Sequence, residues 1–185
     1  MKKLMIILLM ISAFNAVGQV SDFTLTDVLS GQTVSLSGYK ANKGVVVIFI
    51  GQNCPYDNYY LGRITSLISE YHSKTPVLLI NAHPKETAEQ MAAFGKAQNF
   101  SVPYLADKDQ TAMASLGAEK SPSVFLLNNS GSTWTIVYEG AIDDNPQVEV
   151  QVKESYLKNA IDTLLNGGNV AEKSNRPVGC SIRSK

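Results

Sequence analysis

The chain offers two thiols for chemistry, Cys54 and Cys180, and no others among its 185 residues. Cys54 follows a run of six apolar residues, 45–50, which predicts a strand buried on both faces. We expect a helix to begin directly after Cys54, with Pro55 in its first turn. Unpaired backbone N–H groups at a helix start favour an anion, so they should lower the pKa of the Cys54 thiol and make its thiolate a nucleophile.

The alternative for Cys54 is a buried and unreactive structural cysteine, because free cysteines are commonly buried. The polar residues before it and the proline after it favour a turn near the surface, and therefore the reactive interpretation. The expected surroundings of the sulfur are its neighbours in the chain: Gly51, Gln52, Asn53, Pro55 and Tyr56.

Cys180 lies in a polar tail, residues 169–185, which Pro177 and Gly179 should keep non-helical. Three interpretations stay open for it. As a resolving cysteine it would attack an oxidised Cys54, or a mixed disulfide on Cys54, and release the substrate. As a permanent disulfide it would tie the tail to the body in an oxidising compartment. In the third interpretation it is unpaired.

Other polar residues are weaker candidates. Arg63 lies too far along the expected helix for easy contact with the Cys54 thiolate. His83, at the carboxyl end of a strand, could line the crevice, but a loop residue without a chemical role is favoured. Asp143 and Asp144 favour a turn over a proton carrier or a metal site. Two histidines and two cysteines are a poor basis for a zinc site, so we expect no metal and no organic cofactor.

The first 18 residues have the pattern of a secretory signal peptide. Lys2 and Lys3 precede the apolar run 4–11, and small residues end the segment, so cleavage is expected near Gly18 and Gln19. An uncleaved anchor is the alternative, although the run is short for a membrane span. Export to the periplasm or the exterior would place both cysteines where disulfides persist.

Composition indicates one globular domain, which we assign to residues 19–168, followed by the tail 169–185. Hydrophobic residues make up 44% of the chain, which excludes a disordered or collagen-like protein. The chain has 16 lysine and arginine residues and 16 aspartate and glutamate residues, so its formal net charge is zero. This charge balance gives no electrostatic argument for nucleic acid as a partner.

The remaining patterns predict an α/β sandwich, with parallel strands and crossover helices first and antiparallel strands after them. Strands are expected at 23–28, 33–36, 45–50, 76–81, 102–105, 123–127 and 135–139. A turn is expected at 128–132. Helices are expected from 55 to about 72, from 85 to 98, from 110 to 116 and around 156–165.

Four segments resemble the thioredoxin-like superfamily, in its redoxin and peroxiredoxin-related (AhpC/TSA-type) branch: 49–56, 121–126, 139–145 and 177–182. The resemblance implies a three-layer sandwich whose central mixed sheet is flanked by helices. Cys54 aligns with the second cysteine of a C-x-x-C motif, which is also the position of the peroxide-attacking cysteine of peroxiredoxins. Gly51 stands where that motif has its first cysteine. Pro122 resembles the cis-proline that faces the active cysteine.

Three functions follow from this resemblance. The first is thiol–disulfide exchange at Cys54 with protein thiols or disulfides, which Pro122 favours. The second is a thiol peroxidase that reduces peroxide, and in both cases an external thiol reductant would complete the cycle. The third is a binding module without catalysis, because Gly51 cannot supply a partner thiol.

Overall fold

A mixed β-sheet forms the centre of the structure, a computed structural model that describes residues 19–131 and 133–184. The signal peptide prediction therefore lies outside the described residues. The sheet has the order β1-β9-β8-β4-β5-β6-β2-β3, and β10 pairs with β9 beside this path. Its strands are β1 (Gln19–Val20), β2 (Thr24–Asp27), β3 (Thr33–Ser35), β4 (Gly44–Phe49), β5 (Val77–Asn81), β6 (Tyr104–Ala106), β8 (Ser123–Asn129), β9 (Trp134–Gly140) and β10 (Ser174–Asn175).

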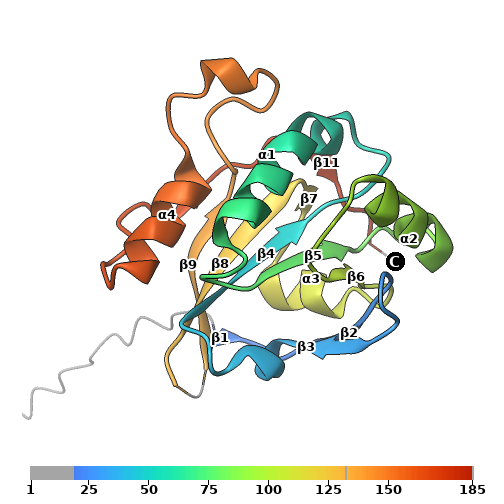
Figure 1. Ribbon diagram of the computed structural model, residues 1–185, viewed down its shortest axis with the longest axis horizontal. Helices are drawn as coiled ribbons and strands as arrows, with labels where there is room; N and C mark the ends of the chain where they lie inside the picture. Colours follow the sequence, from blue (N-terminus) through green and yellow to red (C-terminus); the bar gives the residue numbers. More distant parts are fainter. Residues whose placement is uncertain (1–18, 132, 185) are drawn as a thin grey trace, which may run out of the picture.

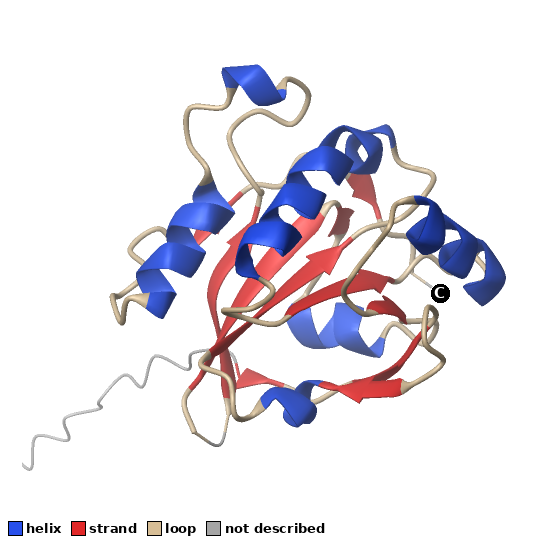
Figure 2. Ribbon diagram, viewed as in Figure 1, coloured by secondary structure: helices blue, strands red, loops and turns tan. Residues whose placement is uncertain are grey.

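Helices cover both faces of this sheet (Figures 1 and 2). They are α1 (Pro55–Tyr71), α2 (Ala88–Ala97), α3 (Thr111–Leu116) and α4 (Tyr156–Leu165), with short 3-10 turns η1 (Leu36–Tyr39) and η2 (Glu149–Gln151). One core cluster joins the sheet to α1, α2 and α4, and a second joins its other face to α3. The predicted three-layer α/β sandwich with a mixed central sheet is confirmed.

Strand β4 is the centre of both cores, as its sequence predicts. It runs parallel to β5 and antiparallel to β8, and all six of its residues are buried. Val46 and Ile48 belong to the cluster under α1, whereas Val45 and Val47 belong to the cluster under α3. Because side chains alternate along a strand, an apolar run is required where both faces are covered.

Most strand boundaries shift by one or two residues from the predicted ones, and two shifts have a clear structural reason. The turn expected at 128–132 begins later, because β8 continues through Asn128 and Asn129, which pair with β9. Helix α2 begins at Ala88 instead of residue 85, because Thr87 caps it. The Thr87 hydroxyl accepts a hydrogen bond from the Gln90 N–H at 3.2 Å, and the Gln90 side chain accepts one from the Thr87 N–H at 2.8 Å.

The polar tail is held against the body at two places. Strand β10 pairs in parallel with β9, and β11 (Cys180–Ser181) pairs antiparallel with β7 (Lys120–Ser121) in a separate two-stranded sheet. Gly140 permits the first contact, because it has a φ of +121° and an added Cβ would lie 1.7 Å from the Asn175 carbonyl oxygen. The tail therefore returns to the strands that follow α3.

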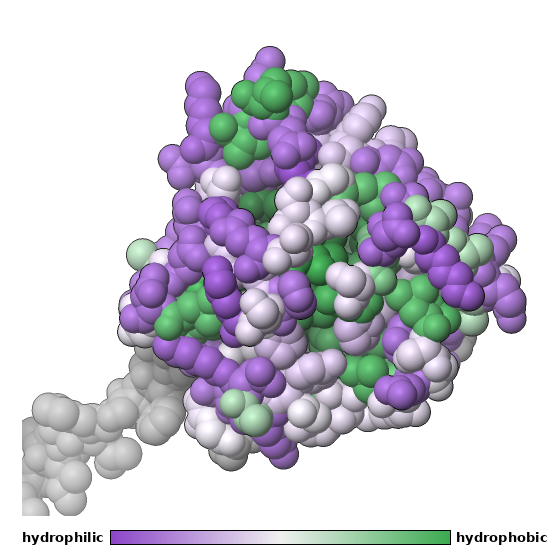
Figure 3. All heavy atoms as spheres, in the orientation of Figure 1, coloured by the Kyte–Doolittle hydropathy of each residue, from purple (hydrophilic) through white to green (hydrophobic). Residues whose placement is uncertain are grey.

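The segment around η2 extends beyond the three layers (Figure 1). Its exposed apolar residues are Val148 and Val150, and Figure 3 shows hydrophobic atoms gathered there. Arg63 of α1 anchors its base by donating hydrogen bonds to the carbonyl oxygens of Asn145 and Pro146. None of the helices within residues 19–131 and 133–184 has both the length and the apolar character that a membrane crossing requires.

Candidate active site

Cys54 lies between the end of β4 and the start of α1, at the position that the sequence predicts. It is the N-cap residue of the helix, with extended backbone angles of −111° and 123°, and Pro55 occupies the first helical turn. Proline is tolerated there because the first helical N–H groups have no partner within the helix. The strand–turn–helix prediction is therefore confirmed.

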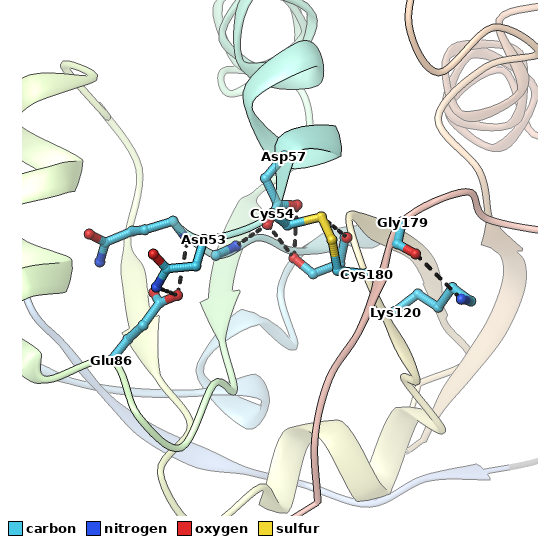
Figure 4. Close-up of a disulfide and its surroundings, with 10 residues drawn as sticks. Asn53, Cys54, Asp57, Glu86, Lys120, Gly179 and Cys180 are labelled. Carbon is cyan, nitrogen blue, oxygen red and sulfur yellow. Dashed lines mark hydrogen bonds between the residues drawn. A yellow bond between two sulfur atoms is a disulfide. The ribbon is translucent and has the colours of Figure 1, made fainter.

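Cys54 and Cys180 form a disulfide in the described structure, with their Cα atoms 5.8 Å apart (Figure 4). This separation lies within the usual range for a disulfide. The interpretation in which Cys180 is unpaired is therefore wrong, and the resolving and permanent roles remain. The bond connects the start of α1 with the C-terminal tail, two parts of the chain separated by 126 residues.

The expectation of a sulfur near the surface is wrong for this oxidised state, because Cys54 is only 1% exposed. The turn itself is at the surface, since Asn53 and Pro55 are exposed. The side chain of Cys54 points inward instead, where Cys180 and the carbonyl oxygen of Ser121, 3.3 Å from its Sγ, lie against it. Cys180 is half-buried. The tail therefore contributes to covering the sulfur.

The Ser121–Pro122 peptide bond is cis, as the resemblance at Pro122 implies. It directly follows β7, the short strand with which the tail pairs. The cis peptide, the start of α1 and the tail thus meet at the disulfide.

Asp57, in the first turn of α1, is fully buried beside the disulfide. Its carboxyl accepts hydrogen bonds from the Gly51 N–H and the Ser121 hydroxyl, each at 2.8 Å. Burial raises the pKa of Asp57 to about 7, and the nearby Glu86 charge adds to the rise, while the bonds from Ser121 and Gly51 oppose it. Asp57 therefore exchanges a proton near neutral pH.

Glu86 holds the turn before Cys54 from the opposite side (Figure 4). Its carboxyl accepts hydrogen bonds from the Gln52 N–H at 3.2 Å and the Asn53 side-chain amide at 3.0 Å. The amide of Asn81, at the end of β5, donates a third at 2.6 Å. These bonds explain how a buried carboxyl group is accommodated, and they give Gln52 and Asn53 a positioning role.

A side chain at Gly51 would be crowded by three neighbouring side chains. An added Cβ would lie 3.1 Å from His83 Cδ2, 3.3 Å from Asp57 Oδ2 and 3.4 Å from Glu86 Oε1. A cysteine at this position would therefore have to displace these side chains by a few tenths of an ångström. His83 thus lines the turn instead of lying free in its loop.

Sequence reasoning missed Asp57, Glu86 and Ser121. An acidic residue in the first turn of a helix is ordinarily explained by the helix dipole, so Asp57 gives no distinguishing pattern. Glu86 lies in a polar loop, and Ser121 attracts notice only as the residue before Pro122. Their proximity depends on long-range packing that no local pattern records.

The other candidates lie around or away from the disulfide. Tyr56 is half-buried and its ring packs edge-on against exposed Tyr59, with centroids 6.0 Å apart. Arg63 instead forms a buried ion pair with Asp143 at 2.6 Å. Tyr60 donates a hydrogen bond to the same carboxylate at 3.0 Å, and burial followed by the Asp143 charge raises the Tyr60 pKa. Asp143 thus has a structural role, whereas Asp144 is exposed.

Across the described part of the chain, no group of three or more histidine, cysteine, aspartate or glutamate residues is arranged to hold a metal ion. The chemistry that the arrangement offers is that of its two sulfurs. A nucleophile at the helix start, a second thiol within bonding distance and a carboxyl that titrates near neutral pH can together exchange a disulfide.

Comparisons with known proteins agree with this geometry. The model of the AhpC/TSA family matches residues 17–142. No curated protein matches the chain. A hypothetical protein from Sinorhizobium meliloti 1021 has a similar structure, with a TM-score of 0.80 and 28% identity over 92% of this chain and 95% of that chain.

Two further solved structures are similar. An uncharacterized conserved protein from Geobacillus kaustophilus has a TM-score of 0.82 and 28% identity, over 90% of each chain. A secreted disulfide oxidoreductase of Mycobacterium tuberculosis has a TM-score of 0.52 and 19% identity, over 60% of this chain and 79% of that chain. The last likeness shows the fold alone, which is thioredoxin-like.

Proposed function

Because the chain belongs to the AhpC/TSA family, we propose that it is a thiol–disulfide oxidoreductase in which Cys54 is the nucleophile and Cys180 the resolving cysteine. The observation that carries this proposal is the Cys54–Cys180 disulfide at the start of α1, next to the cis peptide at Pro122. Two sulfurs held in bonding geometry can store and release two electrons.

In the reduced protein, the Cys54 thiolate attacks one sulfur of a substrate disulfide and displaces the other as a thiolate. The Cys180 thiolate then attacks the Cys54 sulfur of this mixed disulfide and displaces the substrate thiolate. The substrate disulfide has gained two electrons, and the protein dithiol has become the Cys54–Cys180 disulfide. An external thiol reductant returns the protein to the dithiol state by the reverse exchange.

The chain supplies two aids to this exchange. Free N–H groups at the start of α1 stabilise the Cys54 thiolate, as attacking group and as leaving group. Asp57 holds a proton about half of the time at neutral pH, because its pKa is about 7. Its hydrogen bond with the Ser121 hydroxyl, at 2.8 Å, connects it to the residue whose carbonyl contacts the Cys54 sulfur.

Cysteine variants test these roles directly. With the reduced protein, insulin or another disulfide substrate and an external thiol, Cys54→Ser should abolish turnover. Cys180→Ser should leave a mixed disulfide trapped on Cys54, visible by mass spectrometry. Unchanged turnover in Cys180→Ser would leave the disulfide only a structural role. Absence of turnover, together with a Cys54 that does not react with iodoacetamide at pH 7 in the reduced protein, would leave a binding module without catalysis.

The second candidate is a thiol peroxidase, which the match to the AhpC/TSA family favours. Here the Cys54 thiolate would attack a peroxide oxygen, release an alcohol or water, and become a sulfenic acid. Cys180 would displace water from that sulfur and form the same disulfide. Consumption of hydrogen peroxide in the presence of a reductant, without reduction of insulin, would select this function over the first.

The remaining assignments complete the proposal. Residues 1–18 direct export to the periplasm or exterior and are removed near Gly18, leaving the redoxin domain 19–168 and the tail 169–185. An oxidising compartment would let the disulfide persist between cycles. The mass of the protein recovered from the exported fraction tests the cleavage site.

A further inference from the structure

The tail docks beside Cys54 as an added strand. Strand β11 pairs antiparallel with β7, with Cys180 opposite Ser121 and Ser181 opposite Lys120. The Ile182 N–H extends the pairing by donating to the Glu119 carbonyl at 2.9 Å. An exposed sheet edge takes up an extended peptide in this way, mainly through backbone hydrogen bonds.

Strand β7 pairs with β11 alone within the described residues. Without the tail, its backbone groups would form an open edge directly before the cis peptide at Pro122. An unpaired edge is a template for another extended segment. Because Ser121 of β7 lies against the Cys54 sulfur, a segment bonded to that sulfur must pass along this edge.

Few tail side chains contribute to the docking. Ile182 is 8% exposed and belongs to the core cluster that contains Ala112 and Leu116 of α3. The Arg183 carbonyl accepts a hydrogen bond from the Gln110 amide at 2.7 Å. Ser181, in contrast, is exposed. Side-chain recognition is thus concentrated two residues after the cysteine.

The residue before the cysteine is restricted to glycine. An added Cβ on Gly179 would lie 2.4 Å from the Ser121 carbonyl oxygen, 2.7 Å from its carbonyl carbon and 3.0 Å from the Pro122 nitrogen. All three atoms are backbone atoms next to a buried site, so they cannot rotate away as a side chain would. Any segment that docks as the tail does needs glycine at this position.

We propose that residues 177–182 are a built-in competitor for an extended cysteine-containing segment of a partner protein at the edge of β7, and that the crowding at position 179 makes this edge selective for the partner sequence. The partner segment has glycine directly before its cysteine and an aliphatic residue two positions after it. This inference rests on the proposed exchange function, because the partner cysteine is bonded to Cys54 when the segment is docked.

The tail is arranged to leave this edge while staying attached. Between β10 and β11 it borders a groove of about 450 Å³, lined by Arg176 and Pro177 together with Phe125 and Glu139. The tail thus does not fill the space against the sheet there, and we expect β11 to be able to detach while β10 stays paired. The partner disulfide then gains two electrons through the mixed disulfide, as described above, when Cys180 returns and displaces the partner thiolate.

A ten-residue peptide with the sequence of residues 176–185 provides the probe. Its cysteine is joined by a disulfide to thionitrobenzoate, whose release is coloured, and it is mixed with the full chain carrying Cys180→Ser. We expect a mixed disulfide on Cys54, located by peptide mapping. A peptide with Gly179→Ala should react about tenfold more slowly or worse. The matched control peptide, with Ser181→Ala, should react at the unchanged rate.

The reciprocal substitution in the protein should act in the opposite direction. In the chain that carries Cys180→Ser, adding Gly179→Ala weakens docking of the tail. The peptide with the natural sequence, joined to thionitrobenzoate, should therefore react with this chain about fivefold faster or more than with Cys180→Ser alone. A small symmetric disulfide, which does not need the edge, measures the intrinsic reactivity of Cys54 in every variant, and circular dichroism checks that each is folded.

The outcomes separate the two proposals. If the small disulfide reacts while all three peptides react at one rate, the peptide site is refuted and the exchange function stands. If neither the small disulfide nor any peptide reacts with Cys54, the exchange function is refuted and the peptide site with it.

Discussion

Asp57 should make the protein less stable as the pH rises through the neutral range. Its carboxyl is fully buried, and its pKa in the folded protein is about 7, raised from 3.8. Between pH 3.8 and about pH 7 the Asp57 carboxyl of the folded protein holds a proton that the unfolded protein has lost. The resulting stabilisation is complete below pH 3.8 and is lost as the pH approaches and passes 7.

The magnitude follows from the width of this window. Between pH 5 and about pH 7 the folded carboxyl holds a proton that the unfolded one lacks, and each of these two pH units lowers the free energy of unfolding by about 1.4 kcal/mol. From pH 5 to pH 8 the contribution of Asp57 to the free energy of unfolding should therefore fall by about 2.5 kcal/mol. The variant Asp57→Asn has no proton to release. Urea unfolding of the oxidised protein and of this variant at pH 5, 6, 7 and 8 measures the difference between their two profiles.

Glu149→Gln provides the control, because Glu149 is exposed in η2 and its removal should leave the wild-type profile unchanged. The free energy of unfolding of wild type minus that of Asp57→Asn should fall by about 2.5 kcal/mol from pH 5 to pH 8, whatever the constant offset between the two profiles. Parallel profiles for wild type and Asp57→Asn, within about 0.5 kcal/mol, would refute the assignment of a neutral-range proton to Asp57.

Three further substitutions, the first with a matched control at Lys158, test the buried ion pair, the disulfide and the packing at Gly51. Arg63→Met should lower the free energy of unfolding by about 3–5 kcal/mol, because it leaves the Asp143 carboxylate buried without its cation. Lys158→Met, at an exposed ion pair, should lower it by less than about 1 kcal/mol. Urea unfolding measures both. Cys180→Ser opens a loop of 126 residues and should lower the free energy of unfolding by about 2–5 kcal/mol relative to the oxidised protein, measured the same way. Gly51→Cys should lower the free energy of unfolding by about 1–3 kcal/mol through overpacking. Peptide mapping of the oxidised protein should still find Cys180 paired with Cys54. A bond between residues 51 and 54 would contradict the crowding at Gly51.

The strand and helix around Cys54 were predictable because their determinants are local. An apolar run identifies β4, and the spacing of Tyr60, Ile64 and Ile68 along α1 identifies a helix with one buried face. Both patterns are read within one segment of the chain. The order of the elements then limits the topology to a mixed sheet with helices on both faces.

The environment of the sulfur was not predictable in the same way. The buried carboxyl of Asp57 is satisfied in part by Ser121, 64 residues further along the chain, which donates a hydrogen bond to it. Cys54 is covered because the tail pairs with β7, and two short strands with polar residues carry no periodic pattern. A turn at the surface and a buried sulfur are compatible once a distant segment closes over them, and only the tertiary structure shows that segment.

The crowding at Gly51 gives a physical reason for placing the second thiol so far away in the chain. In a C-x-x-C motif both sulfurs belong to one turn, so forming their bond leaves the neighbouring sheet edge as it was. Here a Cβ at position 51 would lie 3.1–3.4 Å from side-chain atoms of His83, Asp57 and Glu86, so a thiol at this position would be crowded. The second sulfur instead belongs to Cys180, in the segment that pairs with the edge of β7. In the oxidised protein the disulfide holds the tail on this edge, so a partner segment can compete for the edge only while Cys54 is reduced and able to react with it.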